Sequence, residues 1–162
     1  MKNEKVLKIL LATDGSSYSK AAVKEVANRP FPPKTSVRII SVINKLALFR
    51  NMGTMVISNE YATEIVGNAL KLAENANEYA AKVLREKNPT LIITTAVIEG
   101  SPKSAILDEA EAFGANLIIV GSHGYGAVER FMLGSVSHAV SLHAKCSVEI
   151  VRIKNNGKKN KS

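Results

Sequence analysis

The sequence has one cysteine, Cys146, no tryptophan, and only 5% aromatic residues in a chain of 162. A lone cysteine cannot form an internal disulfide, which is typical of proteins from a reducing compartment. No apolar run approaches the roughly twenty residues of a membrane span, and the charged N-terminus is not followed by an apolar leader. We therefore expect a cytoplasmic protein without a membrane partner, and an aliphatic core in which Cys146 is buried and inert.

Two phosphate-binding signatures are also missing. The chain contains no G-x-x-x-x-G-K-[ST] motif, which excludes a P-loop NTPase. No G-x-G-x-x-G follows the first apolar run, which argues against an ordinary dinucleotide-binding domain. Any nucleotide site in this chain must be built in another way.

The net charge is +8, and it is unevenly distributed. Residues 154–162 carry four lysines and no acidic residue, which leaves +4 for the rest of the chain. Such a segment either contacts nucleic acid or another anionic surface, or is a solvated end. We favour the second interpretation, because no basic patch with interleaved aromatics is present. We predict one domain at residues 1–153, a basic disordered tail at 154–162, and no nucleic-acid partner.

Five short apolar runs predict the strands of a sheet. Most are rich in β-branched residues and nearly continuous, as in strands that are covered on both faces. The runs are Val6–Ala12, Val37–Val42, Leu91–Val97, Leu117–Val120 and Val148–Ile153. Helical patterns lie between them, and this alternation indicates an α/β fold with a parallel sheet and helices on both faces.

Four helices are expected between the strands. They begin at Ser16 or Ser17, near Ala62, at Pro102 and near Ser135. Pro30 follows the first helix, the second runs to about Glu86, and Gly114 stops the third, which Ser101 caps. Residues 46–61 form a long connection with little periodicity, which is typical of a lid, a binding loop or a mobile segment.

The end of the first strand carries an acidic residue, Asp14. In parallel sheets of this kind, ligands bind beyond the carboxyl ends of the strands, where the winding direction reverses. A carboxylate there can accept hydrogen bonds from ribose hydroxyls or an adenine amine, or help to hold a metal ion. It can equally start a turn or support the N-terminus of the next helix. The residues alone leave both roles open.

The fourth strand leads into a glycine-rich segment, residues 121–135. Glycines let the backbone approach an anion and point successive N–H groups toward it. Gly134 and Ser135 directly precede a helix, whose free N–H groups make a phosphate site. A flexible loop with an ordinary serine cap is the alternative, and the spacing alone does not decide between them.

Together, these segments resemble the universal stress protein family. The spacing Gly121-x2-Gly124-x9-Gly134-Ser135 is similar to the ATP-binding motif of that family. Three further segments are similar to it: Ile9–Ser16, Glu99–Pro102 and Ala115–Gly121. The resemblance runs from about residue 8 to residue 152. It implies an open, Rossmann-like sheet of five parallel strands in the order 3-2-1-4-5, with the ends of strands one and four side by side.

The resemblance also implies a set of binding residues. Those at the adenosine end are Thr13, Asp14 and the backbone around Val42. Those near the ribose and phosphates are Gly121, His123 and Gly124, and those that hold the phosphates are Gly134, Ser135, Val136 and Ser137. The implied ligand is ATP, with AMP or ADP as alternatives, together with Mg²⁺ or Mn²⁺. No metal-ligating residue is assigned.

Several other residues near the motif have two interpretations. His123 contacts the ligand or acts as a base, and no catalytic residue is assigned because no partner carboxylate is evident. Arg130 reaches a phosphate or, as we favour, points to solvent or pairs with a carboxylate. Met52 and Met55 either cover a bound adenine or belong to a mobile segment. The remaining histidines, His138 and His143, are expected at the surface or in packing.

The last strand bears on assembly. In the family that the chain resembles, this strand commonly pairs with its twin in a homodimer. Here Glu149 stands in the middle of the strand, and a charge on an edge strand opposes edge pairing. We expect a homodimer but leave this interface open.

The functional expectation is an ATP-binding regulatory protein whose occupancy changes conformation, assembly or the binding of an unknown protein partner. No clear base, arginine finger or pair of carboxylates of the kind used in phosphoryl transfer is evident. A slow ATP-hydrolysing enzyme on the same scaffold is one alternative. A dimeric stress protein that binds no nucleotide is the other.

Overall fold

The fold is an open parallel sheet of five strands, as predicted. A computed structural model describes residues 6–50, 52–53, 55–125 and 132–154. The strand order β3-β2-β1-β4-β5 confirms the order that the resemblance implied. The strands are β1 (Lys8–Ala12), β2 (Ser36–Ile43), β3 (Ile92–Glu99), β4 (Leu117–Gly121) and β5 (Ser147–Val151). No strand end differs from its predicted position by more than two residues.

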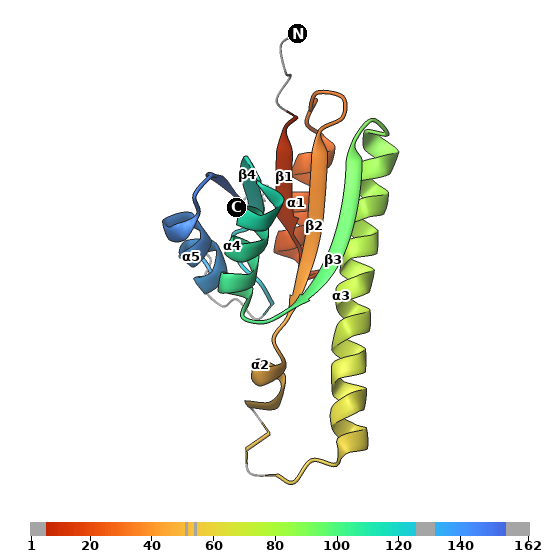
Figure 1. The fold of residues 1–162 in the computed structure, drawn as a ribbon, viewed down its shortest axis with the longest axis vertical. Helices are drawn as coiled ribbons and strands as arrows, with labels where there is room; N and C mark the ends of the chain where they lie inside the picture. Colours follow the sequence, from red (N-terminus) through yellow and green to blue (C-terminus); the bar gives the residue numbers. More distant parts are fainter. Residues whose placement is uncertain (1–5, 51, 54, 126–131, 155–162) are drawn as a thin grey trace, which may run out of the picture.

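Helices cover both faces of this sheet (Figure 1). They are α1 (Ser17–Ala27), α2 (Lys45–Arg50), α3 (Asn59–Lys87), α4 (Pro102–Phe113) and α5 (Ser135–His143). Helices α1 and α3 pack on one face, against Ile9 and Leu11, while α4 and α5 pack on the other, against Leu10. Successive side chains of a strand point to opposite faces, so both faces of β1 are buried and its sequence is apolar throughout.

The ends of the helices follow the predicted signals. The side chain of Ser16 accepts a hydrogen bond from the N–H of Ser19 and caps α1. Pro102 occupies the first turn of α4, and Gly114 ends this helix in the left-handed conformation, with φ of 69°. Ser101 stands at the cap position of α4, but its side chain makes no capping hydrogen bond.

The connection predicted to lack periodicity contains regular structure. Its first part is the short helix α2, and α3 begins at Asn59, before the predicted start near Ala62. Helix α2 buries none of its residues, so it leaves no apolar period in the sequence. The buried residues of α3 all lie between Ala76 and Leu84, in its second half. Its first half and α2 extend past the carboxyl ends of the strands (Figure 1).

Candidate functional site

A cavity of about 670 Å³ lies at the carboxyl ends of β1 and β4, between α1, α4 and α5. Strands β1 and β4 are neighbours in the sheet, with Leu11 paired to Ile119. Strands β2 and β3 are added on one side of β1, and β4 and β5 on its other side, so the winding direction reverses between β1 and β4. Ligands of open α/β sheets bind at such a switch point. All ten residues that the sequence predicted for the site line this one cavity. Their role in binding stays a prediction.

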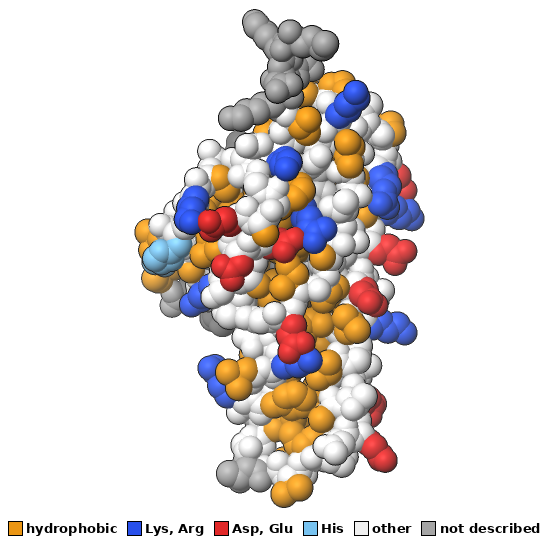
Figure 2. Space-filling model, in the orientation of Figure 1, with side chains coloured by type: hydrophobic (Ala, Val, Ile, Leu, Met, Phe, Trp, Pro, Cys, Tyr) orange, Lys and Arg blue, Asp and Glu red, His pale blue; other side chains and the backbone are white. Residues whose placement is uncertain are grey.

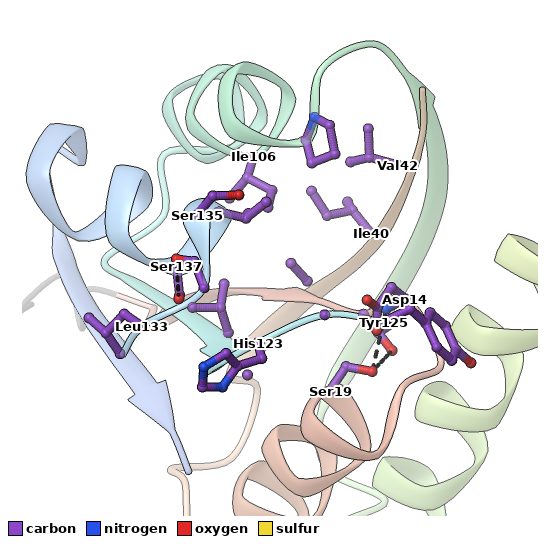
Figure 3. A pocket seen from close by; sticks show the side chains of 18 of the residues that line it. Asp14, Ser19, Ile40, Val42, Ile106, His123, Tyr125, Leu133, Ser135 and Ser137 are labelled. Atoms are coloured by element: carbon purple, nitrogen blue, oxygen red, sulfur yellow. Dashed lines mark hydrogen bonds between the residues drawn. The ribbon is translucent and has the colours of Figure 1, made fainter. Parts of the chain in front are cut away.

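The loop after β1 is held by its own side chains. The Oδ1 atom of Asp14 accepts a hydrogen bond from the N–H of Ser16 at 2.9 Å. Asp14 therefore has the turn-forming role that the sequence left open. Its Oδ2 atom faces the loop after β4, where a Cβ on Gly124 would lie 2.9 Å away. One carboxylate oxygen thus fixes the turn, while the other faces Gly124 at the cavity (Figure 3).

A buried polar network fixes the end of β1 from behind. The hydroxyl of Ser41, in β2, lies 2.7 Å from the carbonyl oxygen of Thr13 and 2.9 Å from Oδ1 of Asn77. The amide of Asn77, in α3, donates to the carbonyl of Ala96 in β3 at 2.8 Å. Thr13 Oγ1 also bonds to the hydroxyl of Ser19. Because Thr13, Ser41 and Asn77 are all buried, this network holds the strand end rigidly.

The N-terminus of α5 forms the opposite wall of the cavity. Its cap residue is Gly134, and no side chain of the described residues makes a capping hydrogen bond there. Gly134 lies close against the loop after β4, because its N–H donates to the carbonyl of Ser122 at 2.8 Å. A Cβ at this position would lie 3.0 Å from that carbonyl oxygen. The first turn of α5 is thus held at the cavity with its N–H groups uncapped by any side chain.

The two serines in the first turn of α5 differ in whether their hydroxyl groups are free to bind a ligand. Ser137 is buried, and its hydroxyl lies 2.9 Å from the carbonyl of Ser122 and 3.0 Å from that of Gly134. Its single proton is therefore used within the chain. Ser135 is exposed, and its hydroxyl makes no hydrogen bond within the part of the chain that the structure describes. Of the two predicted hydroxyl donors, Ser135 is the one available to a ligand.

His123 is packed at the base of the loop after β4. Its Nδ1 atom lies 3.0 Å from the hydroxyl of Ser122, and its ring centroid lies 5.0 Å from that of Tyr18. Its Nε2 atom is buried and has no hydrogen-bond partner among the described residues. The neighbours that orient the ring are thus a hydroxyl and an aromatic ring, which gives no support for a catalytic base.

Gly121 is required for the packing of the end of β4 against the first turn of α1. A Cβ at this position would lie 2.7–2.9 Å from backbone atoms of Tyr18 and Ser19, in the first turn of α1. Only a residue without a side chain allows α1 to approach the end of β4 this closely. The glycine of the predicted motif therefore has a structural role, whatever it contributes to a ligand.

The far end of the cavity is apolar, and the sequence did not predict it. Besides Val42, it is lined by Ile40 from β2 and by Pro102 and Ile106 from α4 (Figure 3). In the sequence these residues have the pattern of ordinary core and helix-start positions, so the sequence alone does not predict that they line a binding site. The strand register and the position of α4 bring them to the cavity.

Other predicted candidates lie elsewhere. Met52 and Met55 do not line the cavity, and Met55 is exposed near the start of α3, whereas Met132 does line it. Arg130 lies outside the described residues, as does the tail from residue 155. His138 and His143 are exposed, as expected.

Cys146 departs from its prediction. The residue is half-buried rather than fully buried. Burial nevertheless raises the pKa of its thiol, which lowers the thiolate fraction at neutral pH. Its reduced reactivity is therefore expected even without complete burial.

Glu149 in β5 is neutralised within the chain. Both of its carboxylate oxygens bond to the guanidinium of Arg29, with Nη1 to Oε2 at 2.6 Å, and Glu25 completes the group. Arg29 lies just beyond α1, so the carboxylate points over the α1 face of the sheet rather than along the edge of β5. Glu149 raises the pKa of Arg29 through this hydrogen bond.

Metal-binding clusters and membrane-spanning helices are both absent from the described residues. No group of three or more His, Cys, Asp or Glu side chains is placed to hold a metal ion. No helix within the described ranges is both long enough and apolar enough to cross a membrane.

The fold and the cavity define an open, doubly wound α/β domain with a ligand crevice at its topological switch point. The universal stress protein family matches residues 5–152 of the sequence, and the chain belongs to this family. Universal stress protein YxiE of Bacillus subtilis is 33% identical over 151 residues, which cover 90% of this chain and 98% of that protein.

Solved structures agree with this assignment. The structure of the hypothetical protein MJ0577 superposes with a TM-score of 0.78 at 27% identity, over 91% of this chain and 96% of that one. A universal stress protein family protein from Arabidopsis thaliana, At3g01520, solved with AMP bound, has a TM-score of 0.66 at 16% identity. That comparison covers 92% of this chain and 93% of the plant chain, and at this identity it supports the fold alone.

Proposed function

We propose that the protein binds an adenine nucleotide, ATP in the first place, and that occupancy regulates its conformation, assembly or binding of a protein partner. The observation that carries this proposal is the N-terminus of α5, which borders the cavity and has no side-chain cap from the part of the chain that the structure describes. Helix N-termini bind phosphate through free N–H groups and the positive end of the helix dipole. The hydroxyl of Ser135 adds a donor at the same place.

The rest of the cavity supports a nucleoside. Its apolar end, with Ile40, Val42 and Ile106, offers side chains against which a planar base can pack. On the wall opposite α5, Oδ2 of Asp14 is a carboxylate oxygen that can accept from ribose hydroxyls. The volume of about 670 Å³ is in the range of small-molecule sites. The cavity thus offers apolar side chains for the base, a carboxylate for the sugar and the N-terminus of α5 for the phosphates.

A divalent cation is expected with a triphosphate, because its charge needs to be neutralised. Asp14 is the one carboxylate among the described residues that line the cavity. Mg²⁺ and Mn²⁺ keep several water ligands and are commonly held by one or two carboxylates and substrate phosphates. The residues present therefore fit a cation that arrives with the nucleotide, with Asp14 as its protein ligand or second-sphere partner.

The remaining parts of the proposal rest on the sequence and the family. They are a cytoplasmic location, a homodimer and a regulatory partner protein. In favour of a binding function rather than turnover, His123 is bonded to Ser122 and not to a carboxylate. Slow hydrolysis is the alternative that the experiment below separates.

The test is to identify and measure the ligand. Freshly purified protein is denatured and the released small molecules are identified by mass spectrometry. Apo protein is then titrated with ATP, ADP and AMP in a calorimeter, with and without Mg²⁺ or Mn²⁺, and phosphate release is followed in parallel. We expect one adenine nucleotide per chain and little turnover. An intact apo protein that gives no heat with any of these nucleotides would refute the proposal.

A matched pair of variants sharpens this test. Gly124→Leu places a side chain where its Cβ would lie 2.9 Å from Oδ2 of Asp14, and we expect it to abolish binding. Gly67→Leu makes the same change in the first half of α3, where a Cβ meets nothing within 4 Å, and should bind normally. Equal loss of binding in both variants would mean that the effect is not local to the cavity.

A further inference from the structure

A second cavity lies behind Asp14, on the α3 side of the sheet. Its volume is about 420 Å³, and its walls come from α1, α2, α3 and the end of β2. Asp14, Val42 and Tyr125 line both cavities, so the two adjoin at the end of the sheet. Tyr125 points away from the first cavity toward α3 (Figure 3), and its hydroxyl lies 3.3 Å from the position of a Cβ on Gly15.

The space exists because small side chains face it where α3 leaves the sheet. Ala69, Ala73 and Ala76 follow one another along one face of the helix and line the cavity. Leu48 of α2 and Leu72 complete the apolar wall, and Leu72 is 70% exposed although it borders the cavity. In the second half of α3 the same face packs on the sheet, whereas here none of the described elements fills the space.

The apolar surface around this region is extensive. Hydrophobic side chains gather at the end of the molecule formed by α2 and the first half of α3 (Figure 2). Leu46 is 80% exposed there. Apolar surface that borders a hollow of this size is typical of ligand-binding sites.

One cation stands at the edge of this apolar wall. Lys20 of α1 is the only basic residue among the described residues that line the cavity. It forms no ion pair within the described part of the chain, and its Nζ lies 5.3 Å from the centroid of the Tyr79 ring. Asp14 also lines the cavity but forms no ion pair with Lys20; its Oδ1 accepts from the N–H of Ser16 and its Oδ2 faces Gly124. The amides of Asn44 and Asn75 add polar groups.

We propose that this second cavity binds an amphipathic organic anion, with an apolar aromatic or acyl body and one carboxylate or sulfonate group. The body packs on Ala69, Ala73 and Leu72, and the anionic group lies near Lys20. The apolar body gains by leaving water, and the unpaired ammonium supplies the complementary charge. This site adjoins the proposed nucleotide site but has walls of its own on α2 and α3.

The probe is 8-anilinonaphthalene-1-sulfonate, an aromatic sulfonate whose fluorescence rises on binding. Apo protein without any nucleotide is titrated, so the result does not depend on the proposed function. We expect one site per chain. Decanoate should displace the probe, and decanol, which has the same apolar body but no charge, should displace it less well.

Two phenylalanine substitutions locate the probe. Ala73→Phe fills the second cavity and should weaken probe binding at least tenfold. Ser135→Phe places the same side chain at the first cavity and should leave binding within twofold. The proposal is overturned if Ala73→Phe binds the probe like the wild type, or if Ser135→Phe abolishes binding. Circular dichroism and a cooperative unfolding transition show that each variant is native, and Ala69→Met is the substitute if Ala73→Phe does not fold.

A second pair of variants tests the charge. Lys20→Met should lower the affinity for the probe about three- to fivefold, which is the effect of losing one partly solvated charge pair. Lys24→Met, one turn further along α1 and outside the cavity, should have no effect. Equal affinities for both variants, or equal displacement by decanoate and decanol, would overturn the assignment of an anion.

Discussion

Helices α1 and α5 both start at the carboxyl ends of the strands, but the N–H groups of their first turns are capped differently. The N-terminus of α1 is satisfied by its own chain, because Ser16 accepts from the N–H of Ser19 and Asp14 accepts from that of Ser16. The N-terminus of α5 has a glycine cap and, among the described residues, no side-chain acceptor. The difference shows which of the two is available to an external anion. We therefore place the phosphates of the proposed nucleotide at α5 and give the loop of α1 a positioning role.

The largest effect is expected where these two regions touch. Gly121→Val introduces a side chain whose Cβ would lie 2.7–2.9 Å from backbone atoms of Tyr18 and Ser19. These are backbone atoms of a packed helix and cannot move aside locally. We expect the free energy of unfolding to fall by about 3 kcal/mol, at the upper end of what overpacking costs. Urea denaturation measures this, and a loss below about 1 kcal/mol would show that α1 moves away easily.

The next effect comes from giving α5 the cap that α1 already has. In Gly134→Ser, the new hydroxyl competes for the N–H groups of the first turn, and its Cβ approaches the carbonyl of Ser122 to 3.0 Å. We expect nucleotide affinity to fall at least tenfold, about 1.4 kcal/mol. Calorimetry with ATP measures the loss. An unchanged affinity would contradict the assignment of α5 as the phosphate end.

The converse change removes the cap of α1. Ser16→Ala deletes the acceptor for the N–H of Ser19, and loss of such a cap costs about 1 kcal/mol. We expect this loss in thermal or urea unfolding, with nucleotide affinity within twofold of the wild type. A large loss of affinity with normal stability would mean that α1, and not α5, holds the anion.

Much of this architecture could be predicted from the sequence, for a physical reason. Strands covered on both faces are apolar throughout, so β1 and β4 stand out within a residue or two of their observed ends. Helix α2 could not be found in this way, because none of its side chains is buried. Apolar residues recur with the helical period only where one face of the helix is buried, so a helix with no buried face has no such pattern.

The residues of the candidate site also fall into a group that could be predicted from the sequence and a group that could not. Asp14, Gly121 and Gly134 could be predicted because their residue types are unusual at a strand end or a helix start. Ile40 and Ile106 could not, because any buried strand or helix has such residues, and only the packing of α4 on the sheet brings them to the cavity. Tertiary structure alone reveals these contacts.

Buried polar residues are an intermediate case. Asn77 lies on the apolar face of α3 beside Ala76 and Ala80, and a lone amide there is a signal that the sequence offered. Its partners, Ser41 and the carbonyl of Ala96, come from strands far away in the sequence, so the network itself could not be predicted.

The smallest predicted effects distinguish the two serines in the first turn of α5, and they extend the comparison to two positions within one helix. Ser137→Ala removes a buried hydroxyl that bonds to the chain's own carbonyls, so we expect a loss of about 1 kcal/mol in unfolding free energy and nucleotide affinity within twofold. Ser135→Ala removes an exposed hydroxyl without such a bond, so stability should stay within about 0.3 kcal/mol while affinity falls about threefold. The two substitutions delete the same atom from the same turn of helix, and each serves as the control for the other. If both weaken binding equally and neither changes stability, then the internal hydrogen bonds of Ser137 give way to the ligand. In that case, the uncapped N-terminus of α5 is more adaptable than its packing against Ser122 indicates.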